Sequence, residues 1–176
     1  MDIDGHWAKE YIEDIRLKGI VKGDSEGRFH PDNPISRGEL TAMVVRAAGL
    51  GETEYAGGFE DVRAEDWYAG VIQTALDKGL IASDRAFRPR DNITREEMSK
   101  IIAGTARLLQ GRQDPPEEFR TGYTDENQIS GWADEFVRFV SYHGLMSGME
   151  DGSFRPAGAA TRAEVATVIS RMLKTE

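Results

Sequence analysis

Apolar side chains recur with the period of an α-helix at three places in the chain. Ala8, Tyr11, Ile12 and Ile15 occupy positions i, i+3, i+4 and i+7, which form one face of a helix. The same spacing returns at Tyr68, Val71, Ile72 and Ala75, and again at Ala133, Phe136, Val137 and Val140. A basic residue and a glycine follow each face, as expected where a helix ends in a left-handed cap. These pairs are Lys18-Gly19, Lys78-Gly79 and His143-Gly144.

A second helical face follows each of these first helices. Each opens with Ser or Thr and a Glu three residues later, the capping box that begins a helix. The three boxes are Ser36…Glu39, Thr94…Glu97 and Thr161…Glu164. A Phe-x-Pro tripeptide stands before each box, and its proline delays the helix start. These tripeptides are Phe29-His30-Pro31, Phe87-Arg88-Pro89 and Phe154-Arg155-Pro156.

One pattern therefore occurs three times: a tryptophan, a glycine twelve residues later, an apolar pair, Phe-x-Pro, and Ser/Thr-Arg-x-Glu. We place repeat one at 1–50, repeat two at 58–110 and repeat three at 122–175, with Gly- and Pro-rich connections. A single two-helix unit cannot bury its own apolar face. We expect an all-α fold in which the three repeats form one compact, pseudo-threefold domain.

Composition narrows the functional classes. The 176 residues include 22 Lys+Arg and 31 Asp+Glu, a net charge of −9. This acidity argues against a general nucleic-acid binder and against electrostatic attachment to a membrane surface. Cysteine is absent, which excludes disulfides and thiolate metal sites. His6, His30 and His143 do not have metal-ligand spacing, so we expect neither a metal nor another cofactor. No apolar run is long enough for membrane insertion.

The sequence offers little for catalysis. It has no cysteine nucleophile, Ser-His pair or phosphate-binding glycine loop. The recurring Glu39, Glu97 and Glu164 already have a structural task in the capping boxes. We therefore expect no catalytic residues and a protein that is not an enzyme.

The motif arginines, Arg37, Arg95 and Arg162, follow the three helix caps. The capping box does not require them, so their recurrence needs another reason. One interpretation is a salt bridge to a neighbouring repeat, for instance to Asp2, Asp61 or Asp125. The other is an anion site that combines each guanidinium with free helix amides. In the second case, loss of an arginine would weaken binding and leave stability almost unchanged.

The tryptophans, Trp7, Trp67 and Trp132, present a similar choice. An indole at the start of an amphipathic helix usually packs in the core or at the rim of a domain. An indole beside a cationic site can instead stack on the face of a sugar.

The run Asp2…Trp7-Ala8…Gly19-Ile20-Val21-Lys22-Gly23…Phe29-His30-Pro31…Ser36-Arg37-Gly38-Glu39 resembles the S-layer homology (SLH) domain. Repeat three ends in an unaltered Thr161-Arg162-Ala163-Glu164, and an aromatic-x-Asp opening ends at Asp61 and at Asp125. The resemblance covers nearly the whole chain.

The resemblance implies a fold and a function. SLH repeats, usually in threes, form a helical spindle around a central three-helix bundle. They anchor exported proteins to the bacterial cell wall or S-layer by binding secondary cell-wall polysaccharide attached to peptidoglycan, commonly through pyruvylated amino-sugars, in grooves between repeats. The implied ligand-binding residues are the motif arginines, the three tryptophans, Asp2, Asp61, Asp125, Gly23 and Gly148.

The repeats also differ. Repeat two has Ser83 where the others have Gly23 and Gly148, and its turn is shorter. Because these glycines can approach a ligand closely and adopt a positive φ, we expect the groove at Ser83 to bind most weakly. The N-terminus lacks the features of a signal peptide, so we expect a module excised from a secreted protein and monomeric by itself. Two alternatives remain: a protein–protein self-assembly module of a surface lattice, and a fragment of a wall-glycan enzyme.

Overall fold

The structure, a computed structural model, describes residues 2–174. Met1 and Thr175, at the predicted limits of repeats one and three, lie outside the described residues. Within them the fold contains α-helices, one short 3₁₀ helix and no strand, which confirms the predicted all-α class. The helices are α1 (Lys9–Leu17), α2 (Arg37–Ala47), α3 (Ala69–Asp77), α4 (Arg95–Gln110), η1 (Glu126–Gln128), α5 (Asp134–Tyr142) and α6 (Arg162–Leu173).

The helices begin and end where local chemistry dictates. The capping boxes of α2, α4 and α6 have both of their hydrogen bonds, from the N3 amide to the cap hydroxyl and from the cap amide to the glutamate. Past the ends of α1, α3 and α5, Gly19, Gly79 and Gly144 have φ of 72°, 69° and 63°. That region is open to glycine and strained for most other residues, so both sequence signals are confirmed.

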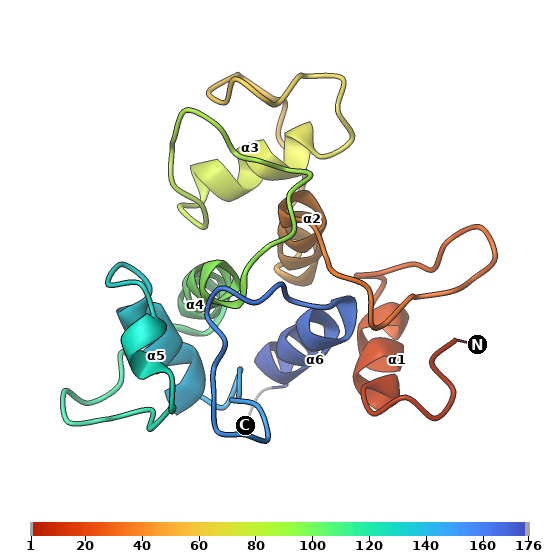
Figure 1. Cartoon of the computed structure of the whole chain (residues 1–176). Helices are drawn as coiled ribbons and strands as arrows, with labels where there is room; N and C mark the ends of the chain where they lie inside the picture. The colour runs from red at the N-terminus through yellow and green to blue at the C-terminus, as the bar shows by residue number, and fades with distance from the viewer. Residues whose placement is uncertain (1, 175–176) are drawn as a thin grey trace.

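The second helices of the three repeats form the centre of the molecule (Figure 1), where α2, α4 and α6 contact one another. Each first helix packs on the second helix of another repeat: α3 on α2, α5 on α4, and α1 on α6. The last of these contacts joins the two ends of the repeat array. The three repeats are therefore interlocked in a closed ring.

A circuit of three backbone hydrogen bonds links the segments that lead into the central helices. Ile35 N–H donates to the Ala160 carbonyl at 3.0 Å, Ile93 N–H to Ile35 at 3.0 Å, and Ala160 N–H to Ile93 at 2.9 Å. All three residues are completely buried. Each pair of repeats is thus joined by one equivalent backbone hydrogen bond, as pseudo-threefold symmetry requires.

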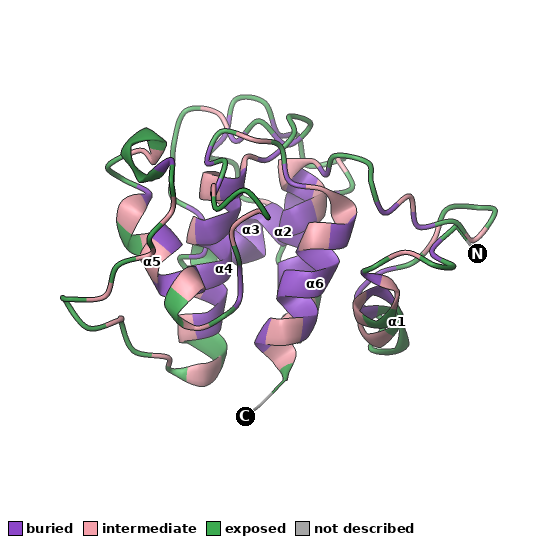
Figure 2. Cartoon of the chain, turned by 60° about the horizontal axis from the view of Figure 1, so that its bottom comes forward, coloured by how far each residue is buried: buried purple, intermediate pink, exposed green. Residues whose placement is uncertain are grey.

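The core lies between the central helices and the first helices packed on them. In Figure 2 the central helices are buried over most of their length, whereas α1 shows exposed positions on its outer side. The apolar faces predicted for the first helices do face the core: Ile12, Ile15, Val71 and Val137 are completely or almost completely buried. None of the helices in residues 2–174 combines the length and the apolar character needed to cross a membrane.

Candidate functional site

Each motif arginine begins a central helix and reaches into the next repeat of the ring. Arg95 Nε donates to the Phe154 carbonyl at 2.7 Å, and the guanidinium carbon lies 4.8 Å from the centre of the Phe154 ring. These contacts combine a charge-assisted hydrogen bond with a cation–π interaction. The same contacts join Arg37 to Phe87 and Arg162 to Phe29, with an Nε–O distance of 2.8 Å in both.

Each guanidinium also forms an ion pair with the capping-box glutamate of that next repeat. The Nη1–Oε1 distances are 3.0 Å for Arg37–Glu97, 2.5 Å for Arg95–Glu164 and 3.0 Å for Arg162–Glu39. The pairs run from repeat one to two, two to three, and three to one. An inter-repeat salt bridge is therefore present, but the predicted aspartate partners were wrong.

Asp2, Asp61 and Asp125 bind backbone amides instead. The Asp125 carboxylate accepts from Phe154 N at 2.7 Å and from Arg155 N at 2.8 Å. Arg155 has a φ of 58°, a conformation that is uncommon for a residue with a Cβ. Asp2 holds Phe29 and His30 in the same way, and Asp61 holds Phe87 and Arg88. These aspartates stabilise the strained Phe-x-Pro turn, which is a structural role.

The helix amides that we expected to attract an anion already have partners. Arg37 N donates to the Asp91 carbonyl at 2.9 Å, and Gly38 N to the Pro89 carbonyl at 2.9 Å. The third amide, Glu39 N, donates to the cap hydroxyl. The first two amides of α4 donate to Gly158 and Pro156, and those of α6 to Asn33 and Pro31. An anion site built from helix amides is therefore wrong, because no amide of the first turn is free to bind a ligand.

The three arginines differ in how accessible they are. Their side chains are 14% exposed at Arg37, 5% at Arg95 and 19% at Arg162. Arg95 makes a further hydrogen bond, from Nη2 to the Ser147 carbonyl at 2.8 Å. Arg162 pairs with the most exposed of the three glutamates, Glu39, at 38%. Arg162 is therefore the arginine best placed to contact a ligand, and Arg95 the one most committed to the fold.

Burial and charge set the ionisation of these pairs. Burial lowers the pKa of Arg37, although the charge of Glu97 opposes this effect. Burial disfavours the ionised form of Glu97, but the Thr94 amide and the charges of Arg37 and Arg88 outweigh it, so the pKa of Glu97 lies below its ordinary value. The pair therefore stays charged at neutral pH.

A groove opens beside each motif arginine. The Arg37 groove has a volume of about 230 Å³, the Arg95 groove about 390 Å³ and the Arg162 groove about 180 Å³. Each is lined by the arginine of one repeat, by the glutamate and at least one residue of the apolar pair of the next, and by the tryptophan of the remaining repeat. The tryptophans are Trp132, Trp7 and Trp67 in the same order.

The tryptophans are largely exposed at the edges of the grooves, which rules out packing in the core; their expected stacking on a sugar stays a prediction. The exposed fractions are 62% for Trp7, 58% for Trp67 and 48% for Trp132. An indole exposed to this degree at the edge of a groove has a free face on which a ligand can stack. In this arrangement every groove depends on all three repeats.

Each groove also holds at least one further cation that was not among the predicted site residues. Arg171 lines the Arg95 groove and Arg46 lines the Arg162 groove, and both stand nine residues after a motif arginine. Repeat two has Gly104 at the equivalent position, but Lys100, one helical turn earlier, lines the Arg37 groove. Lys100 Nζ lies 5.8 Å from the centre of the Trp132 ring. The nine-residue spacing was a signal that could have identified two of the three.

Gly23 and Gly148 are required for close packing and not for a positive φ, which neither has. A Cβ at Gly23 would lie 2.6 Å from the backbone carbon of Gly27. A Cβ at Gly148 would lie 2.7 Å from Cε1 of Tyr123. Gly148 lines the Arg95 groove, so the structure brings it to the arginine, whereas Gly23 is held within its own turn.

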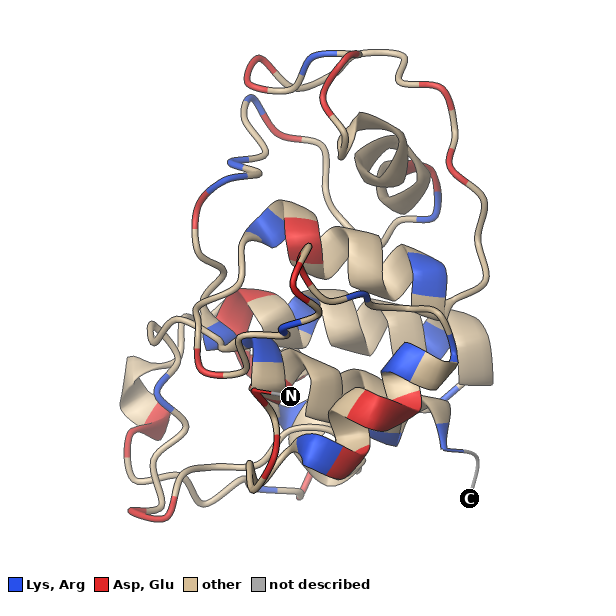
Figure 3. Ribbon diagram, turned by 90° about the vertical axis from the view of Figure 1, so that its right-hand side faces the viewer, with Lys and Arg blue, Asp and Glu red and all other residues tan. Residues whose placement is uncertain are grey.

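Charges of both signs are interspersed over the helices and loops (Figure 3). The local charge differs between the grooves: the Arg162 groove has three cations and one carboxylate, the Arg37 groove three and two, and the Arg95 groove two and two, in a chain whose net charge is −9. Within residues 2–174 no group of three His, Cys, Asp or Glu side chains is arranged to hold a metal ion.

The chain is similar to several bacterial proteins along almost its entire length. It is 37% identical to an amylopullulanase from Thermoanaerobacterium thermosulfurigenes and 36% identical to the exoglucanase XynX of Acetivibrio thermocellus, over 98% of this chain in both. It is 30% identical to the surface-layer 125 kDa protein of Lysinibacillus sphaericus over 96% of this chain. The matches cover 9%, 16% and 14% of those proteins, so the chain spans less than a fifth of their length.

Three segments of the chain match the S-layer homology domain, at residues 2–41, 58–99 and 122–166. Each match includes one tryptophan, one Phe-x-Pro turn and one Arg-x-Glu motif, which are the residues that build the grooves. The chain therefore belongs to the S-layer homology family and contains three of its repeats.

Proposed function

We propose that the chain is a non-catalytic module that anchors a secreted protein to the bacterial cell wall by binding secondary cell-wall polysaccharide in its three grooves. The family match and the surface-layer relative support a cell-wall anchoring module. We further propose that the ligand is this polysaccharide and that pyruvylated amino-sugars are the units that the grooves recognise.

The observation that carries the proposal is the composition of the grooves. Each combines an exposed indole, a motif arginine and a second cation, for example Trp67, Arg162 and Arg46. An aromatic face suits the apolar face of a sugar ring, and guanidinium groups suit a carboxylate such as that of a pyruvate ketal. In the Arg162 groove the cations Arg162, Arg46 and Lys22 outnumber the one carboxylate, Glu39, and salt screens the distant acidic residues beyond about 10 Å.

The groove carboxylates favour binding over catalysis. Glu39 accepts a hydrogen bond from the Ser36 amide at one oxygen and from Arg162 at the other. A glycosidase needs a carboxylic acid that can donate a proton to the leaving group. In the Arg37 groove the Thr94 amide and the charges of Arg37 and Arg88 outweigh burial and keep the pKa of Glu97 below its ordinary value, so that carboxylate stays ionised and is unsuited to that step.

The proposal is tested with purified sacculi of Lysinibacillus sphaericus, before and after extraction of the wall polysaccharide. We expect the module to sediment with intact sacculi and to stay in solution with extracted ones. Trp7→Ala, Trp67→Ala and Trp132→Ala combined should abolish sedimentation, because each exposed indole contributes about 0.5–1.5 kcal/mol. Tyr142→Ala is the matched control, since Tyr142 is 47% exposed and lies outside the grooves.

Other outcomes favour the alternatives. Sedimentation that survives extraction would indicate protein–protein assembly, as in a surface lattice. Release of reducing sugar from the sacculi would indicate an enzyme. Unchanged sedimentation of the triple variant would contradict the assignment of the grooves.

A further inference from the structure

The Arg162 groove does not end at its tryptophan. A depression of about 330 Å³ adjoins the groove and shares Trp67 and Glu39 with it. A third depression of about 460 Å³, here named the Arg90 pocket, adjoins the second and shares Tyr68 and Arg90 with it. Single-ligand pockets measure about 300–1,000 Å³. The groove alone is below that range, but it is the first part of a longer depression.

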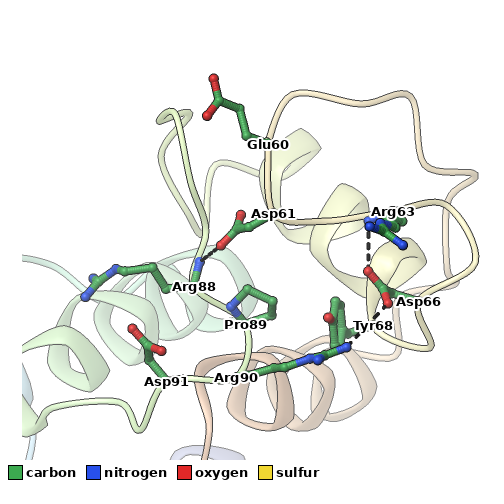
Figure 4. A pocket seen from close by; sticks show the side chains of 9 residues that line it. All are labelled: Glu60, Asp61, Arg63, Asp66, Tyr68, Arg88, Pro89, Arg90 and Asp91. Carbon is green, nitrogen blue, oxygen red and sulfur yellow. Dashed lines mark hydrogen bonds and ion pairs between the residues drawn. The ribbon is translucent and has the colours of Figure 1, made fainter.

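The Arg90 pocket offers both donors and acceptors of hydrogen bonds. Figure 4 shows the Arg90 side chain extending along Tyr68 towards Asp66, with Nη2 at 3.9 Å from the Asp66 carboxylate. Arg90 is 82% exposed, so most of its guanidinium donors face solvent. Its pKa is raised by the hydrogen bond with Tyr68 and by the charge of Asp66. The pocket also contains Arg63, whose amide donates to Asp66 at 2.8 Å.

The mixture of charges indicates the chemistry of the occupant. Acidic and basic side chains of similar number surround the Pro89 ring. A strongly charged ligand would meet repulsion from half of these groups, whereas a sugar hydroxyl can donate to a carboxylate and accept from a guanidinium. The pocket therefore suits an uncharged, hydroxyl-rich sugar unit.

The fold does not require this constellation. The positions of Asp66 and Arg90 are occupied by His6 and Asp32 in repeat one, and by Gly131 and Ala157 in repeat three. Repeat three therefore folds without a polar pair at this place, and repeat one has a pair with the acidic and basic positions exchanged. Tyr68 likewise replaces the alanine of the other two repeats. The combination belongs to repeat two alone.

We propose that a polysaccharide bound at Arg162 continues past Trp67 into the Arg90 pocket, so that this groove recognises at least two consecutive sugar units. The inference rests on the proposed function and adds a second subsite to one of its three grooves. The first unit supplies the anionic group for Arg162, and the second is held through its hydroxyls by Arg90 and Asp66. Length selectivity is then a property of this groove.

The test measures affinity for two polysaccharide fragments from Lysinibacillus sphaericus sacculi, one of a single repeating unit and one of several units. The protein is the full chain carrying Trp7→Ala and Trp132→Ala, which leaves one intact groove and removes avidity as a cause of length dependence. We expect this protein to bind the longer fragment at least about tenfold more tightly. Adding Arg90→Ala should reduce that ratio to about twofold or less.

The matched control is Arg85→Ala in the same two-substitution protein, because Arg85 is also 82% exposed but lies outside the Arg90 pocket. It should preserve the length preference. Equal ratios with and without Arg90, or no length preference before its removal, would overturn the inference. Failure of the two-substitution protein to bind, with binding by the unaltered chain, would also overturn it and leave the proposed function intact. If the unaltered chain binds neither fragment, the proposed function itself is wrong.

Discussion

Replacing Arg95 by alanine should destabilise the fold severely, contrary to the anion-site interpretation of the motif arginines, under which stability would hardly change. Arg95 is 5% exposed and donates to the Phe154 and Ser147 carbonyls and to Glu164. Its loss leaves a carboxylate that is 19% exposed without its cationic partner. Breaking a buried ion pair on one side costs about 3–5 kcal/mol, a large part of the 5–15 kcal/mol that stabilises a typical domain.

The structure also predicts an order among the three arginines. Arg162 is 19% exposed and makes two hydrogen bonds, and its partner Glu39 keeps access to water. Water can solvate the carboxylate left behind, so Arg162→Ala should cost about 1.5–3 kcal/mol, the range of a hydrogen bond to a charged group. Arg37→Ala should lie between the two.

Thermal unfolding followed by circular dichroism at pH 7 measures these differences. For a chain of this size each kcal/mol shifts Tm by about 2–4 °C, so Arg95→Ala should melt about 6–20 °C below the unaltered chain. Arg95→Lys should recover only part of the loss, because an ammonium group cannot reproduce three directed contacts. An Arg95→Ala variant that melts within 2 °C of the unaltered chain, or an Arg162→Ala variant that is the less stable of the two, would refute the reasoning.

Three further predictions concern other parts of the molecule. The free energy of unfolding should fall as the pH drops below 4.5, because the folded-state pKa of Glu97 lies below that ordinary value and its stabilising contribution is lost when it is protonated. In Glu97→Gln, the free energy of unfolding should depend less steeply on pH in this acidic range. Gly148→Ala should lower Tm, since its Cβ would lie 2.7 Å from Tyr123, whereas Gly51→Ala, with open space around it, should not. Calorimetric titration with a monovalent wall saccharide should give fewer than three equivalent sites, and three identical sites would contradict the inequality of Arg37, Arg95 and Arg162.

The repeat structure could be predicted from the sequence because its determinants are local. A capping box such as Thr94…Glu97 and a left-handed glycine such as Gly79 act within a few residues, so their presence fixes helix boundaries directly. The apolar periodicity of Val71 and Ile72 fixed which face is buried. These features gave the all-α class and the two-helix repeat without knowledge of the tertiary contacts.

The partners of the helices and arginines could not be predicted in this way. Nothing local places α1 on α6, or Arg162 against Glu39, 123 positions earlier in the chain. The carbonyls that satisfy the first-turn amides of α2 likewise come from another repeat. The exposure of Trp7 could have been predicted from the sequence, because Trp7 lies outside the i, i+3, i+4, i+7 face that begins at Ala8.

The contact between α1 and α6 has a consequence for how such a protein can change in evolution and in the laboratory. An open solenoid grows by adding units and protects its two ends with special capping repeats. Here the first helix of each repeat packs on one neighbouring repeat, and its second helix receives the first helix of the other neighbour. The repeats therefore resemble the subunits of a cyclic trimer, whose interfaces form a closed ring of three. A fourth unit would find no unoccupied surface, so the number of repeats is fixed by geometry. A circularly permuted chain, opened between 50 and 58 and joined across the present ends, would retain all three interfaces.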